Sequence, residues 1–182
     1  CLLLFSLRCN IAHAGAGGFS GEISGLPLKI HIFADVIRMC MENILEVCAG
    51  DIGSVMAAAE GGAQRVELCA ALALGGVTPS EGFVRAAAAQ IGVKCHVLIR
   101  PREGDFVYTR YEAEIMLDDI DMAARCGATG VVIGALTPDN RIDADICGTL
   151  IERAKEAGLS VTFHRAFDCV ADPLEALETV IS

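Results

Sequence analysis

Two short segments, ILEVCAG at residues 44–50 and RVELCAA at residues 65–71, carry the same pattern. Each is an apolar run in which a glutamate is followed two residues later by a cysteine: Glu46 and Cys48 in the first, Glu67 and Cys69 in the second. Side chains two residues apart lie on the same face of a β-strand. We therefore expect two strands that each present a carboxylate and a thiol on one face and aliphatic side chains on the other.

The rest of the chain continues with an alternation of strand-like and helical segments. Strands are predicted at residues 44–48, 65–69, 94–100, 130–134 and 159–164. Residues 111–126 and 143–157 instead repeat apolar side chains at the spacing of an amphipathic helix. Strands that alternate with helices at this spacing predict an α/β fold with a parallel sheet and right-handed crossovers.

Local signals mark several helix ends. TPSE at residues 78–81 predicts a helix with Thr78 as its N-cap, and TRYE at 109–112 and DPLE at 172–175 repeat that pattern. Glycines are expected to end the helices at Gly92, Gly127 and Gly158.

Two architectures share this element order: an open doubly wound sheet and a (β/α)8 TIM-type barrel. Strands covered by helices on both sides are apolar on both faces, whereas here one face of the strands is polar. Its members are Glu46, Cys48, Glu67, Cys69, His96, Arg100, Thr162 and His164. The interior of a barrel opens into the ligand-binding face at the C-terminal strand ends, so this pattern favours the barrel. Because a complete barrel has eight βα units, we expect a partial barrel of about five.

Composition restricts the functional classes. The chain has 182 residues, is 53% hydrophobic and carries a net charge of −10. Without a basic stripe, neither nucleic acid nor an anionic membrane is expected as a partner. An odd number of cysteines, nine, without a C-x-x-C pair indicates reduced thiols in a cytoplasmic protein. Residues 10–30 show no clear period, and residues 1–42 are interpreted as a poorly ordered leader, a linker or mistranslated upstream sequence before a partial barrel at 43–182, with Met41 a candidate natural start.

Several long motifs occur in one order along the chain. They are LEVCAGDIGSVMAAAEGGAQRVELCAALALGGVTPSEG, IRPREGDFVYTRYE, GVVIGALTPDNRID and VTFHRAFD. From about residue 44 onward this sequence resembles the CutC copper-homeostasis family. The resemblance implies a cytosolic (β/α)8 barrel that forms homo-oligomers and handles copper, and it implies that about three C-terminal βα units are absent. The family commonly has RPRGGDF where this chain has RPREGDF, with Glu103 in place of glycine.

The two strand-end cysteines are the candidate metal ligands. Neighbouring strands lie about 4.8 Å apart, so Cys48 and Cys69, which follow their glutamates equivalently, are expected side by side at the barrel mouth. Two thiolates suit the soft ion Cu(I), and the resemblance implies copper binding at these positions. The alternative is plain packing, because free cysteine is among the most buried residue types.

The remaining polar groups predict a second kind of site, in an enzyme of unassigned reaction. Candidate proton-transfer groups are Glu46, Glu67, His96 and His164. Candidate groups for binding a small anionic or sugar-like substrate are Arg100, Arg102, Asp105, Arg165 and Asp168. The alternative is a structural layer of ion pairs in which Glu46 and Glu67 pair with Arg100 or Arg165. No motif fixes a reaction class, so the sequence leaves both hypotheses open.

Overall fold

The computed structural model describes residues 44–90 and 92–181; the predicted leader at 1–42 lies outside this part of the chain. The strands are β1 (Glu46–Ala49), β2 (Arg65–Leu68), β3 (Lys94–Leu98), β4 (Gly130–Ile133) and β5 (Ser160–Phe163). The α-helices are α2 (Ile52–Glu60), α3 (Glu81–Ala88), α4 (Arg110–Arg125), α5 (Ala144–Glu156) and α6 (Pro173–Ile181). Two 3₁₀ turns complete the described elements, η1 (Leu72–Leu74) and η2 (Arg165–Cys169). The predicted strands and helices are confirmed, with ends that differ by one to a few residues.

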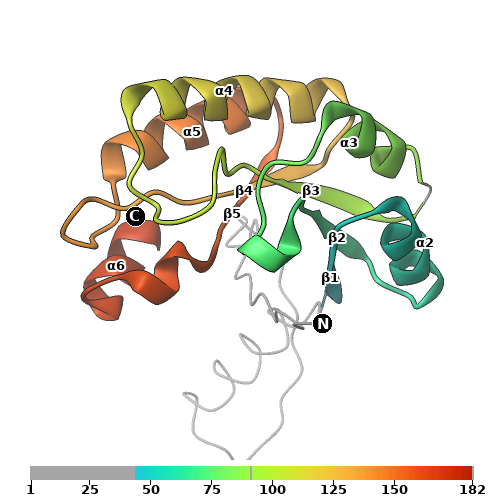
Figure 1. Ribbon diagram of the computed structural model, residues 1–182, viewed down its shortest axis with the longest axis horizontal. Coiled ribbons are helices and arrows are strands. Elements are labelled where there is room, and N and C mark those ends of the chain that lie inside the picture. The colour runs from blue at the N-terminus through green and yellow to red at the C-terminus, as the bar shows by residue number, and fades with distance from the viewer. Residues whose placement is uncertain (1–43, 91, 182) are drawn as a thin grey trace, which may run out of the picture. The chain divides into compact units, whose positions relative to one another are not determined.

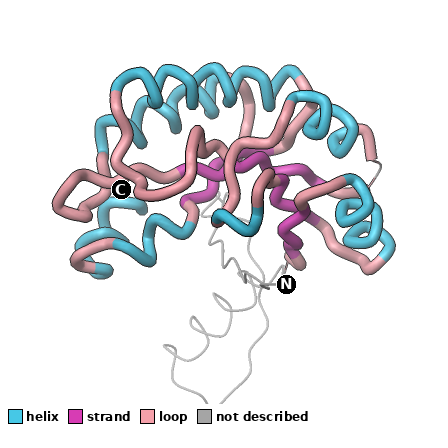
Figure 2. Tube along the Cα trace, in the orientation of Figure 1, coloured by secondary structure: helices cyan, strands magenta, loops and turns pink. Residues whose placement is uncertain are grey.

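The sheet is parallel and its strand order is β1-β2-β3-β4-β5, so each strand pairs with the next in sequence. In a doubly wound sheet the order of strand addition reverses partway through the sheet. Here every new strand is added to the same edge, as in a barrel. Figure 1 shows α2 to α5 along one side of the sheet, and Figure 2 shows the strands gathered at the centre. The α/β partial barrel is therefore confirmed.

The two faces of the sheet differ as the alternation predicts. The main core lies between sheet and helices and includes Val66, Leu68, Val97, Ile99 and Val131, all at most 1% exposed. The inner face carries a separate small cluster of Cys69, Leu98 and Val132. Burying each large aliphatic side chain stabilises the fold by roughly 1.5–3 kcal/mol, so this outer core fixes which side chains point inward.

The inner face is organised in rows set by the strand register. One row runs across all strands through Cys48, Glu67, His96, Gly130 and Ser160. The row nearer the N-terminal strand ends holds Glu46, Arg65 and Lys94. Because a parallel register aligns these residues laterally, each polar side chain has its row neighbours as its first candidate partners.

Helix capping follows the sequence signals except at α3. Thr109 forms the predicted capping box with Glu112, and the Asp172 carboxylate accepts the first free N–H groups of α6. The predicted N-cap Thr78 is wrong, because Ser80 caps α3. The Thr78 hydroxyl instead accepts the Arg100 N–H at 2.9 Å, which fastens the β2–α3 loop to the end of β3.

Gly130, the first residue of β4, and Gly134, which directly follows β4, make room for imidazole rings on the inner face. A Cβ at Gly130 would lie 2.7 Å from Cε1 of His96 and would also collide with the Ser160 hydroxyl. A Cβ at Gly134 would lie 2.6 Å from Cε1 of His164. Both distances are shorter than two carbon atoms tolerate. The two rings can therefore take these positions only because residues 130 and 134 are glycines without a Cβ atom.

We expect the Gly130→Ala variant to be destabilised by roughly 1–3 kcal/mol, because the new methyl group must displace the His96 ring. Gly148→Ala is the matched control, since Gly148 lies within α5 with open space around its Cβ position. That variant should be stabilised by up to about 1 kcal/mol. Urea unfolding of both variants measures the difference, and a Gly130→Ala protein as stable as the control would contradict this packing.

Candidate metal centre and polar inner face

Cys48, Glu67 and Cys69 form one compact group on the inner face. Cys48 lies on β1, Glu67 on β2, and Cys69 directly follows β2. One ligand atom from each, two sulfurs and a carboxylate oxygen, lies within 4.8 Å of the others. The register pairs Cys48 with Glu67 rather than with Cys69, so the two cysteines are diagonal neighbours instead of lateral ones, and they still meet.

The pKa values of the two thiols are shifted in opposite directions. A hydrogen bond from Cys69 lowers the pKa of Cys48, and the same bond, with burial, raises the pKa of Cys69. The single Cys69 S–H can instead donate to a carboxylate oxygen of Glu67, which lies 3.5 Å from the sulfur. Burial, with the nearby Glu46 charge, raises the pKa of Glu67. Cys48 is therefore the sulfur that loses its proton more readily, and Cys69 the one that holds its proton more strongly.

The donor set fits a soft metal ion. Metal–thiolate bonds of roughly 2.3 Å, the length seen with zinc, would span about 4.6 Å from sulfur to sulfur across a single ion. The ligand atoms of the group already lie within 4.8 Å. Cys69 is 2% exposed and Cys48 is half-buried, so an ion would approach from the Cys48 side.

Glu46 is held in a buried ion pair. Its carboxylate accepts from the guanidinium of Arg65, its lateral partner in the register. Both side chains are nearly inaccessible, at 6% and 4% exposed. The predicted pairing of Glu46 with Arg100 or Arg165 is wrong, because Arg65 lies directly opposite. Removing one member of such a pair typically costs about 3–5 kcal/mol, so this contact is structural.

His96 is buried on β3, in the same row as Glu67. Its Nε2 lies 3.0 Å from the Ser160 hydroxyl, and its Nδ1 lies 3.5 Å from the Thr162 hydroxyl. Both ring nitrogens therefore face hydroxyl groups of β5, across the space that Gly130 leaves open.

His164 follows β5 and has a different environment. Its Nδ1 accepts the Ala166 N–H at 3.1 Å, so Nε2 carries the proton of the neutral ring. Nε2 is buried without a hydrogen-bond partner among the described residues. Burial, assisted by the charge of Arg100, lowers the pKa of His164 to about 4. The ring packs against Phe106, with 5.0 Å between the two ring centroids.

Arg100 is buried at the end of β3, at 5% exposed. Its guanidinium donates to the carbonyl oxygens of Gly76 at 2.8 Å and Gly104 at 2.7 Å, with a longer contact to Leu74. No carboxylate within residues 44–90 and 92–181 pairs with it. Its Cζ lies 4.8 Å from the centroid of the Phe106 ring.

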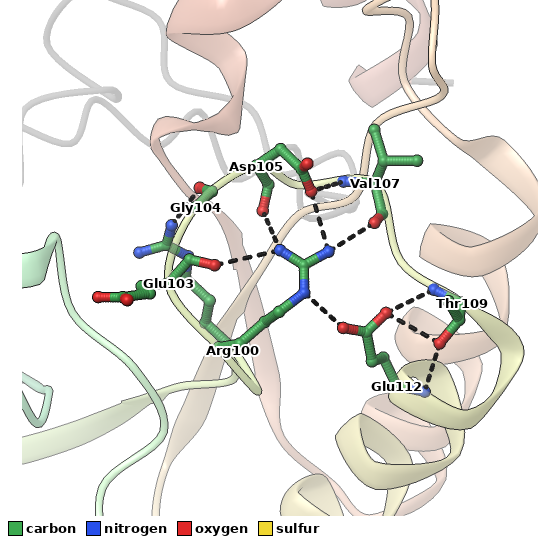
Figure 3. A network of polar contacts seen from close by, with 8 residues as sticks. Arg100, Glu103, Gly104, Asp105, Val107, Thr109 and Glu112 are labelled. Carbon is green, nitrogen blue, oxygen red and sulfur yellow. Dashed lines mark hydrogen bonds and ion pairs between the residues drawn. The ribbon is translucent and has the colours of Figure 1, made fainter.

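Arg102 and Asp105 shape the β3–α4 loop. The Arg102 guanidinium donates to Glu112, to Asp105 at 2.9 Å and to the Val107 carbonyl at 2.8 Å. Figure 3 shows this network, in which Glu112 also closes the Thr109 capping box. These hydrogen bonds lower the pKa of Asp105 and Glu112, so both carboxylates stay ionised and hold the loop.

Other members of the predicted set lie apart from this region. Arg165 and Asp168 pair with each other at 3.2 Å within η2, and both are largely exposed. Glu103 stands where the CutC family commonly has glycine. It has a negative φ, whereas the next residue, Gly104, takes the left-handed conformation at +91°. Position 103 therefore does not require glycine.

Sequence reasoning missed Arg65 and Tyr108. Arg65 lies two residues before Glu67 on the same strand, so the two side chains share a face of the sheet. This alternation could have identified Arg65 as an inward-facing residue. Tyr108 lies in a loop without periodicity, so only its contacts reveal it.

The fold and site together define the class: a partial (β/α) barrel with a thiol pair near the C-terminal ends of its first two described strands. The sequence model of the CutC family matches residues 43–182. This chain belongs to the CutC family. Within the described residues, no helix has the length and apolar character needed to cross a bilayer.

Individual relatives agree with this assignment. A family protein CutC of Pasteurella multocida is 50% identical over 137 residues, 75% of this chain and 55% of that protein. Another, of Bacteroides fragilis strain ATCC 25285, is 51% identical over 143 residues, 78% and 56% of the two chains. The crystal structure of the "Putative Copper Homeostasis Protein CutC" from Streptococcus agalactiae matches with a TM-score of 0.69 at 35% identity, covering 76% of this chain and 68% of that one. The chain thus spans about half the length of the curated relatives it matches.

We predict that His164 titrates at about pH 4 in the folded chain, against 6.5 for an ordinary imidazole. Because the unfolded chain then binds the proton first, the stability that His164 contributes is complete above about pH 6.5 and declines as the pH falls toward 4, by up to about 3 kcal/mol in total. An NMR titration of the imidazole C–H signals, assigned with His164→Gln, measures the value. A His164 signal that titrates near pH 6.5 would contradict the buried, neutral ring.

Proposed function

We propose that this chain is a copper-homeostasis protein that binds Cu(I) through Cys48 and Cys69. The observation that carries the proposal is the placement of both sulfurs within 4.8 Å of each other on the inner face. Two sulfur donors select soft ions such as Cu(I) over the hard cations that carboxylates prefer. The copper-homeostasis name of the Streptococcus agalactiae relative points the same way.

Glu67 has a supporting role in this proposal. A thiol must lose its proton to become a ligand, and the Glu67 carboxylate lies within hydrogen-bonding distance of the Cys69 sulfur, at 3.5 Å. The raised pKa of Glu67 makes it a better proton acceptor than an ordinary carboxylate. Glu67 would thus receive the proton that Cys69 releases when the ion binds.

The wider properties of the protein belong to the same proposal. We infer a cytosolic location and homo-oligomeric assembly from family membership; the chain spans about half the length of the curated relatives it matches. The enzyme hypothesis has weaker support, because several of its candidate groups already form ion pairs. These pairs are Glu46 with Arg65, Arg102 with Glu112, and Arg165 with Asp168. Copper binding therefore remains the better-supported function.

The Cys48→Ser/Cys69→Ser variant should lose Cu(I) affinity by about 100-fold or more, since both sulfur ligands are replaced by hard oxygen donors. The wild-type chain should bind one Cu(I) ion tightly under reducing conditions. Competition with a chromophoric Cu(I) chelator measures both.

The matched control is Cys126→Ser/Cys169→Ser, which removes two thiols that are half-buried and exposed and lie outside the group. It should bind Cu(I) as the wild type does, and circular dichroism verifies that both variants fold. Equal affinity in the two double variants would rule out the proposed site.

A further inference from the structure

Arg100 differs from the other buried arginine of the inner face. Arg65 is 4% exposed and has the Glu46 carboxylate as its counter-charge. Arg100 is 5% exposed; its guanidinium donates to carbonyl oxygens and packs on the Phe106 ring, and no carboxylate in the described part of the chain pairs with it. A guanidinium keeps its charge in proteins, and buried charges are normally paired. The interior beside Arg100 therefore carries an uncompensated positive charge.

Three buried hydrogen-bond groups in this region have no well-aligned hydrogen-bond partner among the described residues. They are Nε of Arg100, the hydroxyl of Tyr108 and Nε2 of His164. The first and third are N–H donors, because the His164 Nδ1 already accepts from Ala166, and the tyrosine hydroxyl can donate as well. Most buried polar groups in folded proteins are satisfied, so these three groups call for a common explanation.

Phe106 contacts Arg100 and His164, and the Tyr108 hydroxyl lies beside Arg100. The Arg100 Cζ lies 4.8 Å from the centroid of this ring, and the His164 ring centroid lies 5.0 Å from it. Tyr108 follows two residues later and is 7% exposed. The positive charge of Arg100 acts on both neighbours, since it lowers the pKa of His164 and opposes the larger effect of burial that raises the pKa of Tyr108.

We propose that Arg100, Tyr108 and His164 form a binding site for a small oxyanion, the carboxylate or phosphate group of a metabolite. The group supplies one fixed positive charge and three donors, which is the complement of an anion with two or more oxygens. It lies at the C-terminal ends of β3 and β5, the end at which barrels of this type bind their ligands. Since the three donor atoms are buried, they recognise one compact anionic group rather than the whole ligand.

This site is independent of the proposed copper ligands. Cys48 and Cys69 come from β1 and the end of β2, whereas the oxyanion site comes from β3, the β3–α4 loop and β5. A barrel that holds both would bring a soft metal ion and an organic anion to the same rim. The two proposals can therefore fail separately.

The test uses inorganic phosphate and acetate as probes, each compared with chloride at equal ionic strength. A bound anion stabilises the imidazolium form, so NMR titration should show the pKa of His164 rising when the effective probe is added. A response to phosphate alone assigns a phosphate group, and a response to acetate assigns a carboxylate. No change with either probe would overturn the proposal.

The chain provides a matched pair of variants, because Tyr108 and Tyr111 are its two tyrosines. Tyr108→Phe removes only the buried hydroxyl and should weaken binding of the effective probe about tenfold or more. Tyr111→Phe, at a side chain 77% exposed on α4, should bind as the wild type does. Equal affinities would overturn the role of Tyr108. The Cys48→Ser/Cys69→Ser variant should retain anion binding, which separates this result from the copper proposal.

Discussion

The parallel register of the five strands is the constraint on which every candidate site in this chain depends. It pairs Glu46 with Arg65 and Cys48 with Glu67, and it aligns His96 with Gly130 and Ser160. A slip of one residue in any strand would move its polar side chains into the helix-packed core and its aliphatic ones inward. The outer core of Val66, Leu68 and Ile99 prevents that slip, because those side chains are wholly buried only in the observed register.

The polar groups of the inner face are paired differently at the two ends of the strands. Near the N-terminal strand ends, Glu46 and Arg65 neutralise each other in a closed pair. At the C-terminal ends, the polar groups are incompletely satisfied: Arg100 has no carboxylate partner among the described residues, and the pKa values of Cys48 and Cys69 are shifted in opposite directions. Satisfied groups stabilise a fold, whereas incompletely satisfied ones are available to a ligand. The chemistry of this chain therefore concentrates at one end of its strands.

Much of the fold could be predicted from the sequence because its signals are local. Alternating side chains gave the inward face, and the capping box at Thr109 gave the start of α4. Contacts between distant segments could not be predicted. Thr78 has the sequence features of an N-cap, but its hydroxyl accepts from Arg100, 22 residues away. The partner of Glu46 and the diagonal meeting of Cys48 with Cys69 depend on the β1–β2 register, which strand composition does not encode.

The central claim is that the register brings two sulfur atoms to one metal ion. Copper K-edge X-ray absorption on the Cu(I)-loaded chain tests it most directly, because the extended fine structure identifies the atoms bound to copper. The account predicts a first shell of two sulfur atoms. A first shell of nitrogen or oxygen atoms would contradict it, because the ion would then lie away from Cys48 and Cys69.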